Sequence, residues 1–335
     1  MRFNIPALYY LLLVTCYLLL FSSCQPPEFN KKKEVQVGKV NLDLRNKRVQ
    51  LLYNLRDKRS TDSLLLFLKD SDVTLRYLAA LSFASVRDSN AIEALTPLLQ
   101  DPAEDVRIAA AFSLGQIGSI RCERPLIEAF LSKDSLSEFQ RFNAVLLEAV
   151  GKCGSRKSLR QIAAVTTYQS SDTLLLEGQC RAILRFALRD SAIIESVGTQ
   201  RMVEYVGDEK IPPSARLVAA YYLARAKDIT LDSAQAVTIG LGFVRAVNYP
   251  EVRAQIALAL SRSKTAPAFG MLSKVIKTEQ DWRVKCQIIK ALGQFSYDTA
   301  RVLVAERLYD SNPHVSRAAA EFFVESGKTQ DGELP

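Results

Sequence analysis

Residues 101–119 have the sequence DPAEDVRIAAAFSLGQIGS, and this stretch decides the fold. Its apolar residues recur at the spacing of three and four that gives a helix one buried face. Asp101, Pro102 and Glu104 match a helix start, with Asp as the N-cap, Pro at the first helical position and Glu three residues after the cap. Gly115 and Gly118 predict the end of that helix and the turn that follows it.

The same pattern returns at YPEVRAQIALALSRSK, which begins at Tyr249, and at DWRVKCQIIKALGQFS, which begins at Asp281. Each copy has a valine and a basic residue, then apolar residues at helical spacing, then a small or polar break. Weaker copies begin at Val73 and Ser214. The basic residues that mark the copies are Arg76, Arg107, Arg216, Arg253 and Lys285, at intervals of 31, 109, 37 and 32 residues.

The interval of 109 residues has room for two or three diverged copies, and segments that begin at Phe139 and Leu176 fit there. The first of them lacks the valine and the basic residue, and the second has Glu177 where the basic residue is expected. A last copy begins at Asn312, where Asn312-Pro313 repeats the helix start. The repeat therefore continues almost to the end of the chain.

A second amphipathic segment follows each marker segment, for example at 90–100, 158–168, 266–277 and 299–309. No alternating run of apolar and polar residues predicts a strand. A lone helix pair cannot bury its apolar stripe, so neighbouring pairs must stack, and alanines such as those at 109–111 would let them approach closely. We therefore predict an all-α fold, an α-solenoid (superhelix) of about 7–8 helix pairs over residues 42–327, with a disordered tail at 328–335.

These copies resemble HEAT repeats, most clearly where Asp105-Val106-Arg107 precedes an alanine pair and Leu114-Gly115. The resemblance covers residues 42–327, and it implies a helical scaffold. Residues 57–95 are also similar to the N-terminal HEAT region of bacterial lipoproteins that end in a cyclophilin-type prolyl isomerase domain. Nothing in this sequence resembles the cyclophilin barrel, so the resemblance implies a scaffold or accessory role without isomerase activity.

The N-terminus has the three parts of a secretory signal. Arg2 supplies a positive charge, residues 5–21 are almost wholly apolar, and Ser22, Ser23 and Cys24 follow. The apolar run is shorter than the roughly 20 residues that a membrane-spanning helix needs. An uncleaved anchor helix with a chance cysteine is the alternative interpretation.

The segment Leu20-Phe21-Ser22-Ser23-Cys24 resembles the lipobox of bacterial lipoproteins. The resemblance implies that residues 1–23 are a signal peptide, that Cys24 becomes the first residue of the mature chain, and that acyl groups on Cys24 anchor it. Two or more acyl chains hold a protein on a bilayer well. Residues 24–41, with a lysine run and two prolines, predict a flexible tether. We expect a lipid-anchored protein of the bacterial envelope, facing the periplasm from the outer membrane.

Charge and cysteine usage exclude several function classes. Loss of residues 1–23 removes Arg2 from a net charge of +8 and leaves 8 − 1 = +7, and an exported protein of that charge is not expected to meet nucleic acid. The mature chain has one histidine, His314, and no CxxC, so we predict no metal, no cofactor and no enzyme activity. Cys122 and Cys153 lie near turns one unit apart, which leaves a disulfide open, and Cys180 and Cys286 are expected to be packing residues.

The remaining candidates concern stacking and partner binding. We expect the marker arginines to pair with carboxylates at the turns, with Asp101, Asp105 and Glu251 as partners. We expect Trp282 and the Tyr221-Tyr222 pair to pack in the core. Partners are expected on the second helices, whose candidate binding residues are Arg124, Arg156, Arg160, Lys274 and Arg301.

Two functions remain open at this point. One is a membrane-anchored scaffold or adaptor that binds a protein or peptide partner in the envelope, with no small-molecule substrate and no catalysis. The other is an accessory or degenerate member of a cyclophilin-type prolyl isomerase and chaperone system in the periplasm. A lyase similar to the HEAT-repeat bilin lyases is a third option, although it would need a chromophore partner in the envelope.

Overall fold

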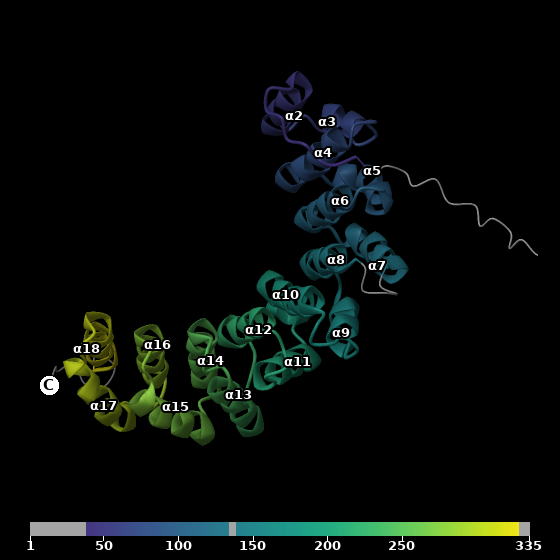
Figure 1. The fold of residues 1–335 in the computed structure, drawn as a ribbon. Helices are drawn as coiled ribbons and strands as arrows, with labels where there is room; N and C mark the ends of the chain where they lie inside the picture. Colours follow the sequence, from purple (N-terminus) through teal and green to yellow (C-terminus); the bar gives the residue numbers. More distant parts are fainter. Residues whose placement is uncertain (1–37, 134–138, 328–335) are drawn as a thin grey trace, which may run out of the picture. The chain divides into compact units, whose positions relative to one another are not determined.

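The computed structural model describes residues 38–133 and 139–327 (Figure 1). Its helices all lie in one compact unit, Lys39–Pro335. The signal peptide, Cys24 and most of the predicted tether lie outside the described residues, as do residues 328–335. None of the described helices combines the length and the apolar character that crossing a bilayer requires.

The described residues form 17 α-helices, α2 to α18, and no strand. The helices are α2 Lys47–Asp57, α3 Thr61–Phe67, α4 Val73–Val86, α5 Ile92–Leu95, α6 Glu104–Ile117, α7 Glu123–Lys133, α8 Gln140–Cys153, α9 Arg156–Ala164, α10 Thr173–Arg189, α11 Ser196–Gly207, α12 Pro213–Arg225, α13 Ser233–Arg245, α14 Pro250–Ser263, α15 Ala266–Thr278, α16 Trp282–Leu292, α17 Tyr297–Ala305 and α18 Pro313–Gly327. Short 3₁₀ helices are η1 Ser89–Ala91, η2 Thr96–Gln100, η3 Ile120–Cys122, η4 Ser191–Ile193 and η5 Glu306–Tyr309.

The helices form two layers. The even-numbered helices from α4 to α18 contact one another in chain order, and we call them the first-helix layer. The odd-numbered helices from α5 to α17 follow them and form the second-helix layer (Figure 1). With α2 and α3 the chain forms eight pairs, and α18 is left as the last helix. The prediction of an all-α solenoid of about 7–8 pairs is confirmed.

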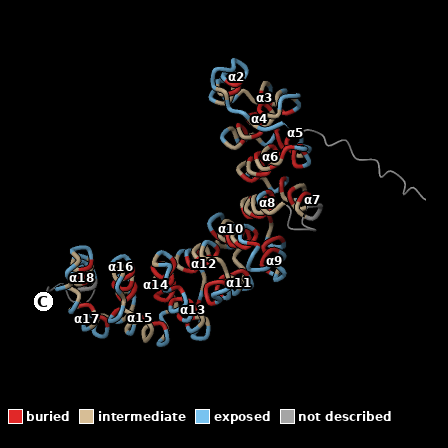
Figure 2. Tube along the Cα trace, viewed as in Figure 1, coloured by how far each residue is buried: buried red, intermediate tan, exposed pale blue. Residues whose placement is uncertain are grey.

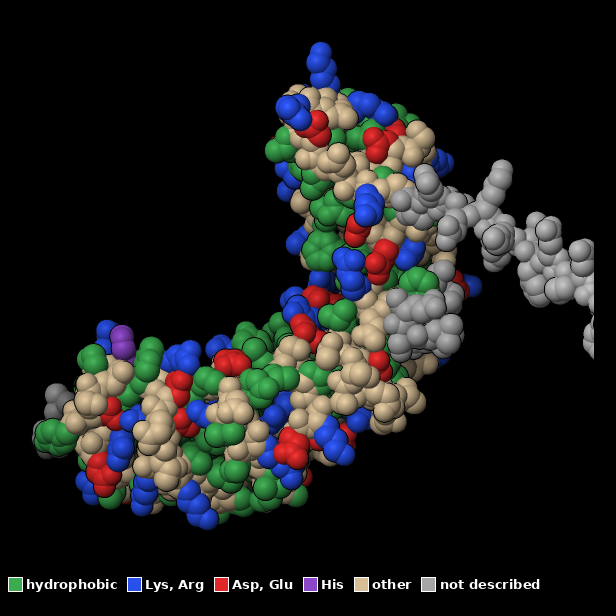
Figure 3. Space-filling view, in the orientation of Figure 1, with side chains coloured by type: hydrophobic (Ala, Val, Ile, Leu, Met, Phe, Trp, Pro, Cys, Tyr) green, Lys and Arg blue, Asp and Glu red, His purple; other side chains and the backbone are tan. Residues whose placement is uncertain are grey.

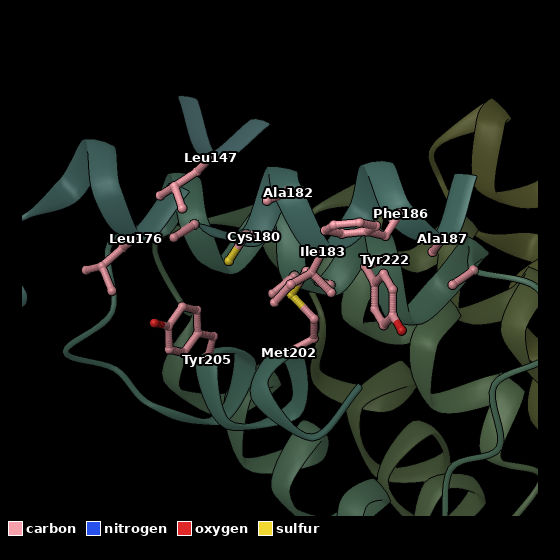
Figure 4. Close-up of a cluster of buried hydrophobic side chains, with 14 of the residues drawn as sticks. Leu147, Leu176, Cys180, Ala182, Ile183, Phe186, Ala187, Met202, Tyr205 and Tyr222 are labelled. Carbon is pink, nitrogen blue, oxygen red and sulfur yellow. The ribbon is translucent and has the colours of Figure 1, made fainter. Parts of the chain in front are cut away.

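The core runs between the two layers along the stack (Figure 2). Figure 4 shows one part of it, where Cys180, Ile183 and Phe186 of α10 lie opposite Met202 and Tyr205 of α11. All five side chains are buried. Each pair therefore buries its apolar stripe against its own second helix and against its neighbours, as stacked repeats require.

Small residues set the spacing within the first-helix layer. A Cβ added at Gly115 of α6 would lie 2.8 Å from the Cα of Ala149 on α8, and one at Gly178 of α10 would lie 2.8 Å from the Cα of Ala144. The prediction that Gly115 ends its helix is therefore wrong, because it lies inside α6 at a close helix contact. Gly118 does end the helix, with a φ of 71° that a side chain would strain.

The start of α6 also differs from the prediction. α6 begins at Glu104 with Ala103 as its N-cap residue, so Asp101 is not the cap and Pro102 is not the first helical residue. Asp101 is buried instead, and its Oδ1 accepts a hydrogen bond from the backbone N–H of Ala103 at 2.9 Å. The Asp101 carboxylate lies in the turn itself, where a half-buried arginine of the preceding unit pairs with it.

That arginine belongs to the marker positions. Arg76 donates to both oxygens of Asp101, at 2.8 and 3.1 Å, and its Nη1 also donates to the carbonyls of Asp70 and Ser71. One side chain thus connects the turn before its helix to the turn after its helix pair. Such bidentate, charge-assisted contacts are among the stronger hydrogen bonds in proteins.

The same arrangement recurs in the C-terminal half. Arg253 donates to Glu279 at 2.8 Å and to the carbonyl of Val247, and Lys285 donates to Asp310 at 3.0 Å. The carboxylate lies 25 or 26 residues after the basic residue in each case.

The expected pairing of marker residues with turn carboxylates is confirmed for Asp101. It is wrong for Asp105, which pairs with Arg141, and for Glu251, which is exposed. It is also wrong for the marker residues Arg107 and Arg216, which donate to backbone carbonyls instead.

In the diverged unit of α10 and α11, an uncharged pair of side chains replaces the marker cation and its carboxylate. Gln179 of α10 is fully buried, its amide donates to the carbonyls of Ile162 and Val165, and Tyr205, 26 residues later, donates to it. Glu177, which the sequence placed at the marker position, is half-buried and pairs with Arg181 at 2.5 Å. The marker register of this unit is therefore shifted by two residues from the predicted one.

We expect Arg253→Ala to lower the free energy of unfolding by about 3 kcal/mol, because it leaves Glu279 buried without its cation. Denaturant unfolding followed by circular dichroism measures this loss. Arg317→Ala, at an exposed pair with Glu321, is the matched control and should change stability by less than about 0.5 kcal/mol. Equal effects of the two substitutions would contradict the structural role of the marker pair.

We expect Ala110→Asp to unfold the neighbouring repeats, because Ala110 is fully buried and the new charge would have no partner. Ala320→Asp introduces the same charge at an exposed position of α18 and is the control. Thermal unfolding should show a melting temperature at least several degrees lower for the first variant only. An unchanged melting temperature for Ala110→Asp would refute the helix register.

Candidate functional site

A groove of about 650 Å³ lies on the exposed side of the first-helix layer, across α10, α12, α14 and α16. Helical spacing of three and four residues brings its lining side chains to one side of each helix. The lining residues are Arg181, Leu184, Arg185, Leu188, Leu217, Val218, Tyr221, Pro250, Glu251, Ala254, Gln255 and Arg283. We call this feature the groove.

The floor of the groove is apolar and open to solvent. Leu188 is 54% exposed and Tyr221 is 36% exposed, although both are large apolar side chains. Figure 3 shows hydrophobic side chains gathered over α10 and α12, next to charged ones. A contiguous exposed apolar surface with a charged border is typical of a site where another molecule binds.

Tyr221 and Tyr222 point to different sides of α12, because successive helical residues are about 100° apart. Tyr222 is buried, and its hydroxyl lies 2.9 Å from the Thr199 Oγ1. The prediction of core packing is therefore confirmed for Tyr222 and wrong for Tyr221, which lines the groove. It is also wrong for Trp282, which is 41% exposed and stacks on the ring of His314.

A charge network closes the end of the groove at α8 and α10. Glu148 of α8 pairs with Arg185 at 2.8 Å, with Lys152 at 3.3 Å and with Arg181 at 3.7 Å. Burial alone would raise the pKa of Glu148, but the Lys152 and Arg185 cations outweigh it and hold that pKa below its usual value. The arginines at this end are therefore neutralised by protein carboxylates.

A smaller hollow of about 310 Å³ lies between α8 and α10 and shares Arg181 with the groove. Ile108, Val145 and Leu174 supply its apolar lining. The exposed side of the first-helix layer therefore has adjoining hollows from α6 to α16.

The predicted partner-binding residues lie elsewhere, on the second-helix layer. Arg124 on α7 pairs with Glu128 of the same helix, Arg156 and Arg160 on α9 share Glu195, and Arg301 on α17 lies 3.4 Å from Asp298. Lys274 on α15 is exposed. The structure brings only Arg156 and Arg160 together, and none of the five lines the groove.

The groove residues carried a weaker sequence signal than the basic residues did. Leu188 and Leu217 extend apolar stripes that are slightly wider than a two-layer stack needs to bury. A count of apolar positions around α10 and α12 could have identified this excess.

Three of the four thiols in the described part of the chain are buried. Cys122 and Cys153 are buried and free, and burial raises the pKa of the first to about 11 and of the second to about 12. Such thiols are poor nucleophiles at neutral pH. Cys180 is fully buried, as expected of a packing residue, and Cys286 is half-buried. No group of three or more His, Cys, Asp or Glu side chains within residues 38–133 and 139–327 could hold a metal ion.

Comparison with known proteins supports the repeat and the fold. The family model of HEAT repeats matches residues 61–141 and 243–325. An engineered protein of known crystal structure is 17% identical, covers 83% of this chain and 81% of its own, and has a TM-score of 0.52. No curated protein matches the chain.

Two natural proteins of known structure are more distant. Human deoxyhypusine hydroxylase in complex with glycerol is 15% identical over 84% of this chain and 100% of its own, with a TM-score of 0.36. The complex of CpcE and CpcF of phycocyanin lyase from Nostoc sp. PCC7120 is 16% identical, and the match covers 82% of this chain and 100% of the other chain, with a TM-score of 0.41. At these scores neither protein's activity bears on this chain.

We expect Glu148→Gln to lower stability at pH 7 by about 1 kcal/mol, because it leaves Arg185 and Lys152 without their shared carboxylate. A carboxyl group whose pKa is lowered by folding stabilises the fold above its unfolded-state pKa, and this contribution is lost as the pH falls through its folded-state pKa. Urea unfolding of both proteins at pH 7 and pH 3 should therefore show a smaller difference in stability at pH 3 than at pH 7. A difference that is equal at both pH values would contradict the assignment.

Proposed function

We propose that this HEAT-repeat protein is a scaffold that is anchored in a bacterial envelope by lipid on Cys24 and binds a protein partner in the groove. It has no catalytic activity of its own. HEAT repeats form helical scaffolds for protein interaction, and the repeat match supports that part of the proposal. The observation that carries the choice of surface is the open apolar groove across α10 to α16.

The groove suits a protein partner better than a small molecule. Small-molecule sites usually enclose most of the surface of the ligand, whereas Leu188 and Tyr221 lie open on the sides of two helices. Tyrosine and arginine are enriched among the residues that contribute most to protein interfaces, and both line the groove. The predicted basic residues on the second-helix layer are mostly neutralised by nearby carboxylates, and exposed ion pairs contribute little.

The membrane anchor is supported by the sequence alone. The apolar run at 5–21 and the serine pair before Cys24 match a lipoprotein signal, and the lysine-containing tether would give the repeats reach from the membrane. A groove held near the envelope surface would meet envelope proteins at a raised effective concentration.

The test is site-specific photocrosslinking in cells that produce the full chain. A photoreactive amino acid at Leu188 should capture one reproducible envelope protein, identified by mass spectrometry. The same residue at Leu66, which is 78% exposed on α3, is the control and should not capture it. A further probe at Lys274 tests the second-helix surface.

Each pattern of capture has a distinct meaning. Capture at Leu188 alone supports the proposed surface, whereas capture only at Lys274 would move the interface to the second helices. Capture of a prolyl isomerase, or of many unfolded proteins, would favour the accessory role in an isomerase and chaperone system. No capture at either position would contradict the scaffold proposal.

Cys24→Ala should block lipidation and leave the precursor uncut or in the wrong compartment, because the acyl anchor would be missing. Membrane fractionation with metabolic labelling by a fatty-acid analogue checks this. Cys16→Ala removes the other cysteine near the N-terminus and should change neither property. A Cys24→Ala protein that is still processed, labelled and membrane-bound would refute the anchor.

A further inference from the structure

Another hollow, of about 460 Å³, lies on three of the helices that form the groove. Its charged side chains are Arg225 at the end of α12, Arg262 and Lys264 at the end of α14, and Lys290 on α16. Among the residues that the structure describes, no Asp or Glu side chain lines it. We call it the basic pocket.

The cations of the basic pocket differ from those of the groove in their partners. Arg181 and Arg185 in the groove pair with Glu177 and Glu148. Within the described residues, no carboxylate lies within ion-pair distance of the four basic-pocket cations. Their positive charge is therefore not cancelled by the protein itself.

The contacts that these cations do make are weak. The Arg225 guanidinium lies 4.9 Å from the centre of the Tyr221 ring, and Arg262 donates to the carbonyl of Ala224 at 3.4 Å. The C-terminal ends of α12 and α14 also attract cations, each contribution being about 0.3–1 kcal/mol. This attraction explains how the fold tolerates the charges, but it leaves them facing solvent.

The basic pocket adjoins the groove. Arg225 is one helical turn after Tyr221 on the same side of α12, and its guanidinium packs against the Tyr221 ring. On α14 the groove is lined up to Gln255, and the basic pocket begins at Leu258. A molecule that fills the groove would therefore lie next to the basic pocket.

Lys290 also lines a hollow between α16 and α18, in which Glu321 and Glu325 lie. These carboxylates attract a cation from the far side of α16. The unshared positive charge of the basic pocket is therefore concentrated on α12 and α14, at Arg225, Arg262 and Lys264.

We infer that the partner of the groove is an acidic peptide segment, whose apolar side chains occupy the groove and whose carboxylates bind in the basic pocket. This inference rests on the proposed function and adds the chemistry of the partner. Complementary charge would fix the direction of the segment and raise its association rate. An acyl chain is less well suited, because the groove is open and would leave much of the chain in water.

The test uses two fluorescein-labelled synthetic peptides and the purified full-length protein in detergent micelles. The peptides share an apolar half of Leu, Phe and Ala, and end in four Glu or in four Gln. Fluorescence anisotropy measures Kd at 50 and 500 mM NaCl. We expect the Glu peptide to bind at least tenfold more tightly at low salt, and this preference to shrink at high salt because the charges are exposed.

The variant Arg225→Glu, Arg262→Glu and Lys264→Glu reverses the three cations on which the unshared charge of the basic pocket is concentrated. The control variant Lys157→Glu, Lys274→Glu and Lys277→Glu reverses three exposed lysines on the second-helix layer and changes the net charge equally. We expect only the first variant to lose the preference for the Glu peptide. Thermal unfolding of both variants verifies that they are folded.

Other results would overturn the inference. Equal binding of the two peptides, no binding of either, or an unchanged preference in the first variant would each do so. Vesicles of phosphatidylglycerol that bind the wild type but not the first variant, without any peptide preference, would assign the pocket to a membrane surface. The proposed function fails separately, through the absence of capture at Leu188 in cells.

Discussion

The stack is tied together by a basic side chain, half-buried or buried, that connects two turns. In the units marked by Arg76, Arg253 and Lys285, a basic side chain reaches a carboxylate 25 or 26 residues later. The two arginines also donate to carbonyls in the preceding turn. This contact therefore spans one helix pair, from the turn before it to the turn after it. Because the carboxylate also accepts a backbone N–H of the next turn, it ties each unit to its successor.

The diverged middle of the chain shows what this contact requires. Gln179 and Tyr205 make an uncharged version at the same spacing, with the same connection to the preceding turn. This unit therefore has no charge at the marker position, but it keeps a buried hydrogen-bonding side chain there. This fits the expectation that buried polar groups must be satisfied and that they then specify one arrangement.

Much of the fold could be predicted from the sequence, because the period of the repeat and the helical spacing of apolar residues are local signals. The role of Asp101 could not, since an Asp-Pro start matches an N-cap equally well until the partner from the preceding unit is known. The sequence pattern placed Glu177 at the marker position, whereas the structure places Gln179 there. A polar side chain two residues away fits the same pattern equally well. Cys24 and the tether stay predictions, since Cys24 and most of the tether lie outside the described residues.

The candidate surface was harder to predict, because it arises where neighbouring helices leave apolar side chains uncovered. Basic residues on the second helices are conspicuous in the sequence, yet Arg156 and Arg160 share one carboxylate in the structure. Tyr221 is inconspicuous in an apolar helix, yet it is exposed between the groove and Arg225. The second-helix surface and the groove therefore differ in which side chains are exposed and which are paired with a carboxylate. Both properties depend on tertiary contacts, which the sequence pattern does not show.

The most direct test of this account is covalent tyrosine labelling of the protein in intact envelopes and after purification, read by mass spectrometry. Tyr309, which is 90% exposed on η5, is the internal reference. The account predicts that Tyr221 is labelled less in envelopes than in the purified protein, while Tyr309 is labelled equally in both. Equal labelling of Tyr221 in the two samples would contradict the claim that a partner covers the groove.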